Sequence, residues 1–224
     1  MTDEEYTAVR RVCAPLRQPV VVELGARTGE DEDALRRAFR EPCKYVMVEA
    51  DMSNCQAILD HSHDSQPSGT YLTINRRLIL GAVAGHNGTV TFHGAKSADD
   101  ARTSGSIRKP TGHLRYFPEI TFPDELRTVV PCYTLDEIFR RELLEKIDLL
   151  WVDIQGAERD MIAGGAAALA RTRYMFIEAE DEELYEGEAL KQELIAMLPG
   201  WVVLQDFGYN LLMRNDNDLL TGRI

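Results

Sequence analysis

The chain has 224 residues, and 37 acidic against 25 basic residues give it a formal charge of −12. This balance disfavours nucleic-acid and anionic-membrane partners, because both surfaces are bound through basic patches. The hydrophobic share of 44% and the charged share of 28% are typical of a globular domain. No apolar run approaches the ~18 residues of a membrane span, and the acidic start lacks the apolar core of a secretory signal. We therefore expect a cytoplasmic protein.

Short apolar runs bounded by breakers predict the strands, and helical patterns lie between them. The predicted strands are 20–24, 45–49, 78–84, 147–154, 174–178, 201–204 and 210–213. The first five are almost continuously apolar, as parallel strands covered on both faces are, and the last two suit an antiparallel pair. The predicted helices are 30–40, 53–59, 136–144, 158–169 and 184–197, after an N-terminal helix over about 1–17 capped by Thr2. This alternation predicts an α/β fold with a mixed sheet, in one domain over 1–224.

The alternation is interrupted between Ala84 and Val129. A hairpin is predicted at 89–92, and the polar segment 97–122 then shows no clear period. Loops this long are usually functional, so we expect a substrate-facing insertion over about 95–127; a surface insertion without a role is the alternative. Four side chains on this insertion suit hydrogen bonds to a polyhydroxylated acceptor. They are Ser104, Ser106, His113 and Tyr116.

Two strand ends indicate a site for a nucleoside-containing ligand. The run VVVELGARTGED places Glu23 at a strand end, followed by Gly25 and Gly29 and then by two acids. The spacing is not the G-x-G-x-x-G of dinucleotide sites, and the acids favour a cationic ligand over a phosphate. Glu49 ends the second strand in YVMVEAD, where a carboxylate can accept both hydroxyls of a ribose. The alternatives are a solvated strand-end acid at Glu49 and a ribose contact from Asp51.

Two further strand ends present acids at the same predicted edge. Asp153 and Gln155 follow the apolar run IDLLWV, and Glu178 ends the next strand in YMFIE. Asp153 has a second interpretation as a helix cap. Because the carboxyl ends of neighbouring parallel strands meet, we expect these side chains to lie close together.

The chain resembles the FkbM-type S-adenosylmethionine-dependent O-methyltransferases, a branch of the Rossmann-like class I methyltransferases. The segments that carry the resemblance are VELGARTGE, YVMVEAD, AVAGHNGTVTF, YTLDEIF, IDLLWVDIQGAERDMIAGG and FIEAEDEELYEG. Trp151 stands where lysine is usual in the family, and Gln155 where glutamate is usual. The resemblance implies a seven-stranded sheet whose last strand is antiparallel.

The resemblance also assigns the cofactor site. The residues that it implies for S-adenosylmethionine are Glu23, Gly25, Ala26, Thr28, Gly29, Glu49, Ala50, Ala84 and Asp153. The turn from Gly25 to Gly29 would hold the methionine portion, and Glu49 the ribose. The loop after Ala84 would border the adenine, with His86 and Asn87 as contacts.

For catalysis, we expect Asp153 and Glu178 to flank an acceptor hydroxyl, either as base and orienter or as oxygen ligands of Mg²⁺. Gln155 would bind the substrate or complete the metal shell. The expected acceptor is a sugar, an oligosaccharide or a related small molecule. A nicotinamide-dependent oxidoreductase and a catalytically degenerate binding module are the competing functions, and a homodimer is plausible from the frequency of such dimers.

Overall fold

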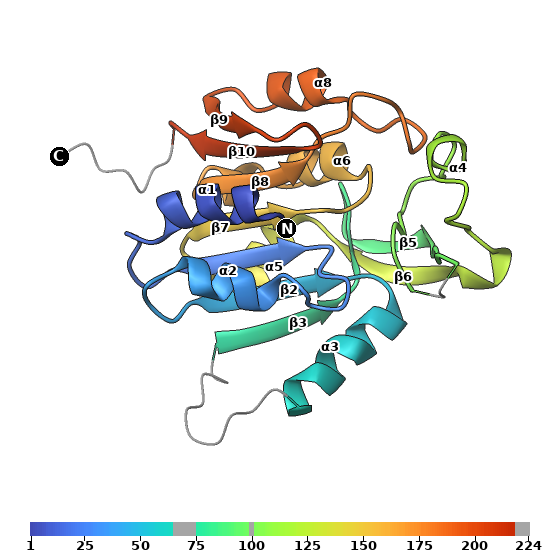
Figure 1. Cartoon of the computed structure of the whole chain (residues 1–224), viewed down its shortest axis with the longest axis horizontal. Coiled ribbons are helices and arrows are strands. Elements are labelled where there is room, and N and C mark those ends of the chain that lie inside the picture. Colours follow the sequence, from blue (N-terminus) through green and yellow to red (C-terminus); the bar gives the residue numbers. More distant parts are fainter. Residues whose placement is uncertain (65–74, 99–100, 218–224) are drawn as a thin grey trace.

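The computed structural model describes residues 1–64, 75–98 and 101–217, and its centre is a seven-stranded sheet (Figure 1). Its strands are β1 (Val20–Leu24), β2 (Lys44–Glu49), β3 (Arg76–Leu80), β7 (Ile147–Val152), β8 (Thr172–Glu178), β9 (Trp201–Asp206) and β10 (Asn210–Asn215). The order across the sheet is β3-β2-β1-β7-β8-β10-β9. Strand β10 is antiparallel to both of its neighbours, and the other pairings are parallel. The predicted mixed sheet with an antiparallel last strand is confirmed.

Helices cover both faces of this sheet, because alternate strand residues point to opposite sides. One face carries α1 (Asp3–Cys13), α2 (Glu32–Ala38) and α3 (Met52–Asp64), and the other carries α5 (Leu135–Arg141), α6 (Glu158–Ala163), α7 (Ala166–Leu169) and α8 (Lys191–Ala196). Val21 and Tyr45 belong to the hydrophobic core beneath α1, α2 and α3. Val22 and Val46 belong to the hydrophobic core on the opposite face, beneath α5 to α8. Both faces of the central strands are therefore buried, as their continuous apolar runs predicted.

The backbone confirms the predicted cap of the first helix and divides one predicted helix into two. Thr2 caps α1 in a reciprocal capping box with Glu5. The predicted helix over 158–169 is divided into α6 and α7 at Gly164 and Gly165. The four cysteines are free and buried, as expected for reduced thiols.

The prediction of a single strand over 78–84 is wrong. The chain leaves the large sheet at Gly81, and β4 (Ala82–Val83) belongs to a second sheet with the order β4-β6-β5. A side chain at Gly81 would place its Cβ 2.7 Å from the ring of Tyr133, so this close crossing requires glycine. Figure 1 shows the small sheet at the end of the large sheet toward which the parallel strands point.

The hairpin predicted at 89–92 is also corrected. Strand β5 (Gly88–His93) pairs antiparallel with β6 (Arg127–Tyr133), which lies on the far side of the polar segment. Strand β6 was not predicted, because four of its seven residues are exposed and it contains Pro131. The segment 95–127 is thus a long excursion between two paired strands, and it contains α4 (His113–Tyr116) and the 3-10 turn Asp124–Leu126.

The predicted helix over 184–197 is mostly wrong, because only α8 is helical within it. Gly187 interrupts the preceding residues with a φ of +69°. The carboxylate of Glu188 accepts the backbone N–H groups of Leu184 and Tyr185, which fixes an irregular turn there. Within the part of the chain that the structure describes, we find no helix that is both long and apolar enough to cross a bilayer.

Candidate active site

A pocket of about 930 Å³, including its opening to solvent, lies at the carboxyl ends of β1, β2 and β7. The segment 102–107 forms its outer wall. Nine predicted site residues line it, namely Glu23, Gly25, Ala26, Glu49, Ala50, Ser104, Ser106, Asp153 and Gln155. Ligands of open α/β sheets bind at this edge, so the strand-end argument led to the correct place.

The turn after β1 brings the backbone very close to the end of β7. An added Cβ on Gly25 would lie 1.7 Å from the carbonyl oxygen of Asp153, and its φ is +81°. The N–H groups of Gly25 and Ala26 both donate to the carbonyl of Val48, at 2.9 and 3.1 Å. Glycine is therefore required here on steric grounds, and the turn forms the floor of the pocket.

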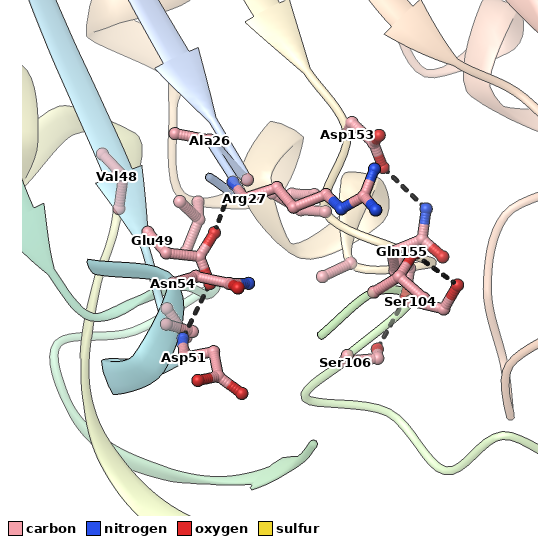
Figure 2. Close-up of a pocket in the computed structure, with 18 of the residues that line it drawn as sticks. Ala26, Arg27, Val48, Glu49, Asp51, Asn54, Ser104, Ser106, Asp153 and Gln155 are labelled. Atoms are coloured by element: carbon pink, nitrogen blue, oxygen red, sulfur yellow. Dashed lines mark hydrogen bonds between the residues drawn. The ribbon is translucent and has the colours of Figure 1, made fainter. Parts of the chain in front are cut away.

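Glu49 is a buried carboxylate that is fixed by two backbone donors. The N–H of Arg27 donates to its Oε2 at 2.8 Å, and the N–H of Asp51 to its Oε1 at 2.7 Å (Figure 2). Burial nevertheless raises the pKa of Glu49 to about 7. The carboxylate is thus rigidly placed, and each oxygen retains a lone pair for a ligand hydroxyl.

Glu23 is buried at the deep end of the pocket and accepts the hydroxyl of Tyr45 at 2.8 Å. Burial, followed by repulsion from neighbouring acids, raises the pKa of Glu23 well above its usual value. A positively charged ligand group would relieve this penalty, so the pocket suits a cation.

Gln155 joins the two strand-end acids. Its amide Nε2 donates to Oδ1 of Asp153 at 2.6 Å and to Oε2 of Glu178 at 2.7 Å. The residue adopts the left-handed conformation with φ +53°, which directs its side chain back across the strand ends. Glu178 does not line the pocket itself, but its carboxyl group contacts Asp153 and Gln155, which both line it. The predicted proximity of Asp153, Gln155 and Glu178 is therefore present in the structure.

The two carboxyl groups differ in their affinity for a proton. Burial and then repulsion from Asp153 raise the pKa of Glu178 well above its usual value. Desolvation by the surrounding protein also raises the pKa of Asp153, but hydrogen bonds from Gln155 and from the Glu178 carboxyl oppose this rise, and Asp153 keeps contact with solvent. A proton on Glu178, held against an ionised Asp153, is the arrangement that follows. Asp153 then has the character of a base at the pocket wall.

Several residues that sequence reasoning missed also line the pocket. Figure 2 shows the Arg27 side chain crossing from the Glu49 side toward Asp153, and its Nη1 donates to Glu30 at 2.6 Å. Arg102 lies 3.9 Å from Asp51, and its carbonyl accepts the amide of Asn54. The only sequence signal for Arg27 was its position between the two glycines of the first turn.

Other residues predicted for the cofactor site do not line the pocket in this structure. Gly29 supports the turn by donating to the carbonyl of Ala26 at 2.7 Å, while Thr28 and Ala84 do not line the cavity. His86 and Asn87 are not beside it either. His86 contacts Cys132, and the side-chain Oδ1 of Asn87 accepts the backbone N–H of Thr134 at 2.9 Å.

The two aromatic members of the predicted acceptor site are displaced as well. The His113 ring is 2% exposed and packs against Phe117, Phe122 and Tyr185, and burial lowers its pKa. Tyr116 is exposed on α4 and donates to Glu182 at 3.2 Å. Neither side chain reaches the pocket in this structure, because α4 packs on the loop after β8 and not over the pocket.

The Asp153–Glu178 pair does not fit a Mg²⁺ site in this arrangement. The amide N–H groups of Gln155 occupy the side of both carboxylates that a cation would need. Over residues 1–64, 75–98 and 101–217 there is no group of three or more His, Cys, Asp or Glu side chains that could hold a metal ion. We therefore derive no step through a metal.

Comparison with known proteins identifies the family. The model of the FkbM methyltransferase domain matches residues 23–211. The chain belongs to this family. The 2-O-methyltransferase NoeI of Sinorhizobium fredii is 37% identical to it over 134 residues, which are 58% of this chain and 54% of that protein. The chain therefore spans about half the length of this curated relative.

The fold agrees with that of a solved FkbM protein. The crystal structure of methyltransferase FkbM from Methylobacillus flagellatus superposes with a TM-score of 0.57 over 89% of this chain and 44% of that one, at 14% identity. The FkbM match includes all three strand ends that carry Glu23, Glu49 and Asp153, so the pocket described above lies within the family domain.

Proposed function

We propose that the protein is an S-adenosylmethionine-dependent O-methyltransferase that acts on a hydroxyl of a sugar or related polyhydroxylated molecule. The observation that supports the proposal is that the carboxyl-bearing residues Glu49 and Asp153 line the same pocket, where the first would hold a ribose and the second would act as a base. The FkbM family match supports the same activity.

The residues present fit the cofactor. Glu49 would accept the ribose hydroxyls, and the turn at Gly25 and Ala26 would hold the amino-acid end. The nearby carboxylates of Glu23 and Asp153 favour an ammonium and a sulfonium group. When bound, S-adenosylmethionine supplies a methyl group on a positively charged sulfur.

Asp153 and its neighbours would activate the acceptor. The transfer would form a bond between the acceptor oxygen and the methyl carbon and break the bond between that carbon and sulfur, which leaves a neutral thioether. Asp153 would take the hydroxyl proton. Gln155 and protonated Glu178 hold Asp153 in position, and alignment of the reacting atoms contributes part of the ~7–11 kcal/mol available from orientation.

The acceptor class is supported by two observations. The relative NoeI is named a 2-O-methyltransferase and shares 37% identity with this chain. Ser104 lies on the pocket wall, on the segment that would face the acceptor. A hydroxyl-bearing acceptor is favoured by this polar residue, because a serine hydroxyl can both donate to and accept from a hydroxyl group.

Calorimetric titration with S-adenosylhomocysteine, with NAD⁺ in a parallel cell, tests the cofactor. We expect micromolar binding of the first compound and none of the second. Transfer of labelled methyl groups to free sugars and oligosaccharides then tests the reaction, with and without EDTA.

Asp153→Asn separates catalysis from binding. Loss of a general base costs ~10²–10⁴-fold in rate, so we expect a turnover loss in that range while S-adenosylhomocysteine still binds. Binding of NAD⁺ alone, or full turnover by Asp153→Asn, would overturn the proposal.

A further inference from the structure

Tyr185 lies on the irregular turn after β8, in a segment predicted to be helical, and its hydroxyl reaches the strand-end acids indirectly. The single hydroxyl hydrogen faces two acceptors, Oε1 of Gln155 and the backbone carbonyl oxygen of Ser104, each at 2.8 Å. Tyr185 is buried, with 1% exposure. Its oxygen is thus held between the pocket wall and the amide that joins Asp153 and Glu178.

The Gln155 amide is oriented by the two carboxylates on one side and by the Tyr185 hydroxyl on the other. Both amide hydrogens are used, one on each carboxylate, so the carbonyl oxygen must point to Tyr185. The reverse orientation would place that oxygen against both acids and the N–H groups against the hydroxyl. A donor at Tyr185 therefore favours the amide orientation that stabilises ionised Asp153.

Tyr185 is itself fixed on several sides. The Glu188 carboxylate accepts its backbone N–H at 3.2 Å, and its ring packs on His113 and Phe122 with centroid distances of 5.4 and 6.4 Å. The N–H groups of Gly112 and His113 both donate to the carbonyl of Leu184 at 2.9 Å. The segment 104–122 and the turn after β8 are packed as one unit.

We propose that Tyr185 is a positioning residue, which holds the Gln155 amide toward Asp153 and Glu178 and thereby keeps Asp153 ionised as the base. This inference rests on the proposed function. It also assigns His113 a supporting role as packing for the Tyr185 ring, in place of the acceptor contact predicted from the sequence.

Tyr185→Phe tests the proposal, because it removes the donor and keeps the ring. We expect the acid limb of the turnover–pH profile to shift by about one unit toward alkaline pH, so that turnover falls by up to about tenfold at pH values below the apparent pKa of the base. Turnover should recover at alkaline pH, while the KM for S-adenosylmethionine stays within about twofold. The matched control is Tyr116→Phe, which removes a hydroxyl from the exposed contact with Glu182 and should change neither value.

A second readout does not depend on turnover. Carboxyl ¹³C NMR of the ligand-free protein follows the titration of Asp153 and Glu178, and Tyr185→Phe should raise the lower of the two apparent pKa values. If the wild type transfers no methyl group but this shift occurs, the proposed function fails and the positioning role stands. An unchanged NMR titration in Tyr185→Phe overturns the positioning role, whatever the turnover. A turnover loss that is the same at every pH overturns it as well.

Discussion

The backbone N–H of Arg27 donates to the side chain of Glu49 at 2.8 Å, and so ties the turn after β1 to the end of β2. We expect the turn after β1 to hold the amino-acid end of the cofactor and Glu49 to hold its ribose. This hydrogen bond fixes the positions of these two parts of the pocket relative to each other. Protonation or substitution of the Glu49 carboxylate should therefore lower the affinity for the cofactor more than it lowers the stability of the fold.

Binding of S-adenosylhomocysteine should weaken as the pH falls from 8 to 6. Burial raises the pKa of Glu49 to about 7, so protonation below this value removes the acceptor that the ribose hydroxyls need. For one such group the affinity falls about tenfold per pH unit below the pKa. Calorimetry at pH 6, 7 and 8 measures this, and Glu49→Gln should bind weakly with little pH dependence. A wild-type Kd that is constant over the range would contradict the role of Glu49.

Arg27→Gln should weaken binding of the cofactor's amino-acid end selectively. The Arg27 guanidinium donates to Glu30 through Nη1, and its Nε has no hydrogen-bond partner among the described residues. A charged hydrogen bond to the ligand carboxylate contributes ~1.5–3 kcal/mol, which is about tenfold to a hundredfold in Kd. We expect this loss for S-adenosylhomocysteine and less than about twofold for 5′-methylthioadenosine, which lacks that carboxylate.

The matched control is Arg102→Gln, because Arg102 lines the same pocket beside Asp51. It should affect both compounds equally. Equal losses for both compounds in Arg27→Gln would show that Arg27 does not contact the carboxylate.

Gln155→Glu should convert the acid pair into a cation-binding cluster. It replaces a donor amide between Asp153 and Glu178 with a third carboxylate, and oxygen clusters of this kind bind divalent cations. We expect turnover to fall at least about tenfold at neutral pH, because repulsion raises the pKa of Asp153. Electron paramagnetic resonance should detect bound Mn²⁺ in this variant. Gln155→Leu should lose turnover without gaining Mn²⁺, and Mn²⁺ binding by the wild type would refute our assignment of the pair.

Gly25→Ala should destabilise the fold far more than Gly208→Ala. Both glycines have positive φ, of +81° and +95°, but only at Gly25 does an added Cβ collide with backbone. The conformational cost alone is ~1–2 kcal/mol, which we expect for Gly208→Ala. At Gly25, the clash with the Asp153 backbone should add to this conformational cost. Chemical denaturation measures the free energy of unfolding of both variants. Similar losses of unfolding free energy at the two positions would mean that the turn after β1 shifts to accommodate the added Cβ.

The stability of the ligand-free protein should fall as the pH rises from about 5 to 8. Burial raises the pKa of Glu158 to about 8 from a usual value of 4.5. The folded state therefore holds a proton in this window that the unfolded chain has lost, and stability decreases with pH. Glu158→Gln should show a smaller drop in Tm between pH 5 and pH 8. An identical drop would place the pH dependence on other groups.

The sequence by itself determined the large sheet and the location of the pocket. Continuous apolar runs that end in Glu23, Glu49 and Asp153 predict buried parallel strands, and the carboxyl ends of such strands share one edge. Chain order and hydrophobic periodicity are local properties, so they can be recognised without coordinates. The same reasoning predicted that Glu178 lies close to Asp153, because their strands are neighbours in the sheet.

Only the tertiary structure decided how these residues are connected. Gln155 bridges two acids because a left-handed backbone turns its amide toward them, and Tyr185 meets that amide across 30 residues of chain. The strand break at Gly81 depends on a ring contributed by Tyr133, from a strand on the other side of the polar segment. His113 packs against Phe117, Phe122 and Tyr185 and does not line the pocket. These contacts join residues that are distant in sequence, and no local pattern encodes which distant groups will meet.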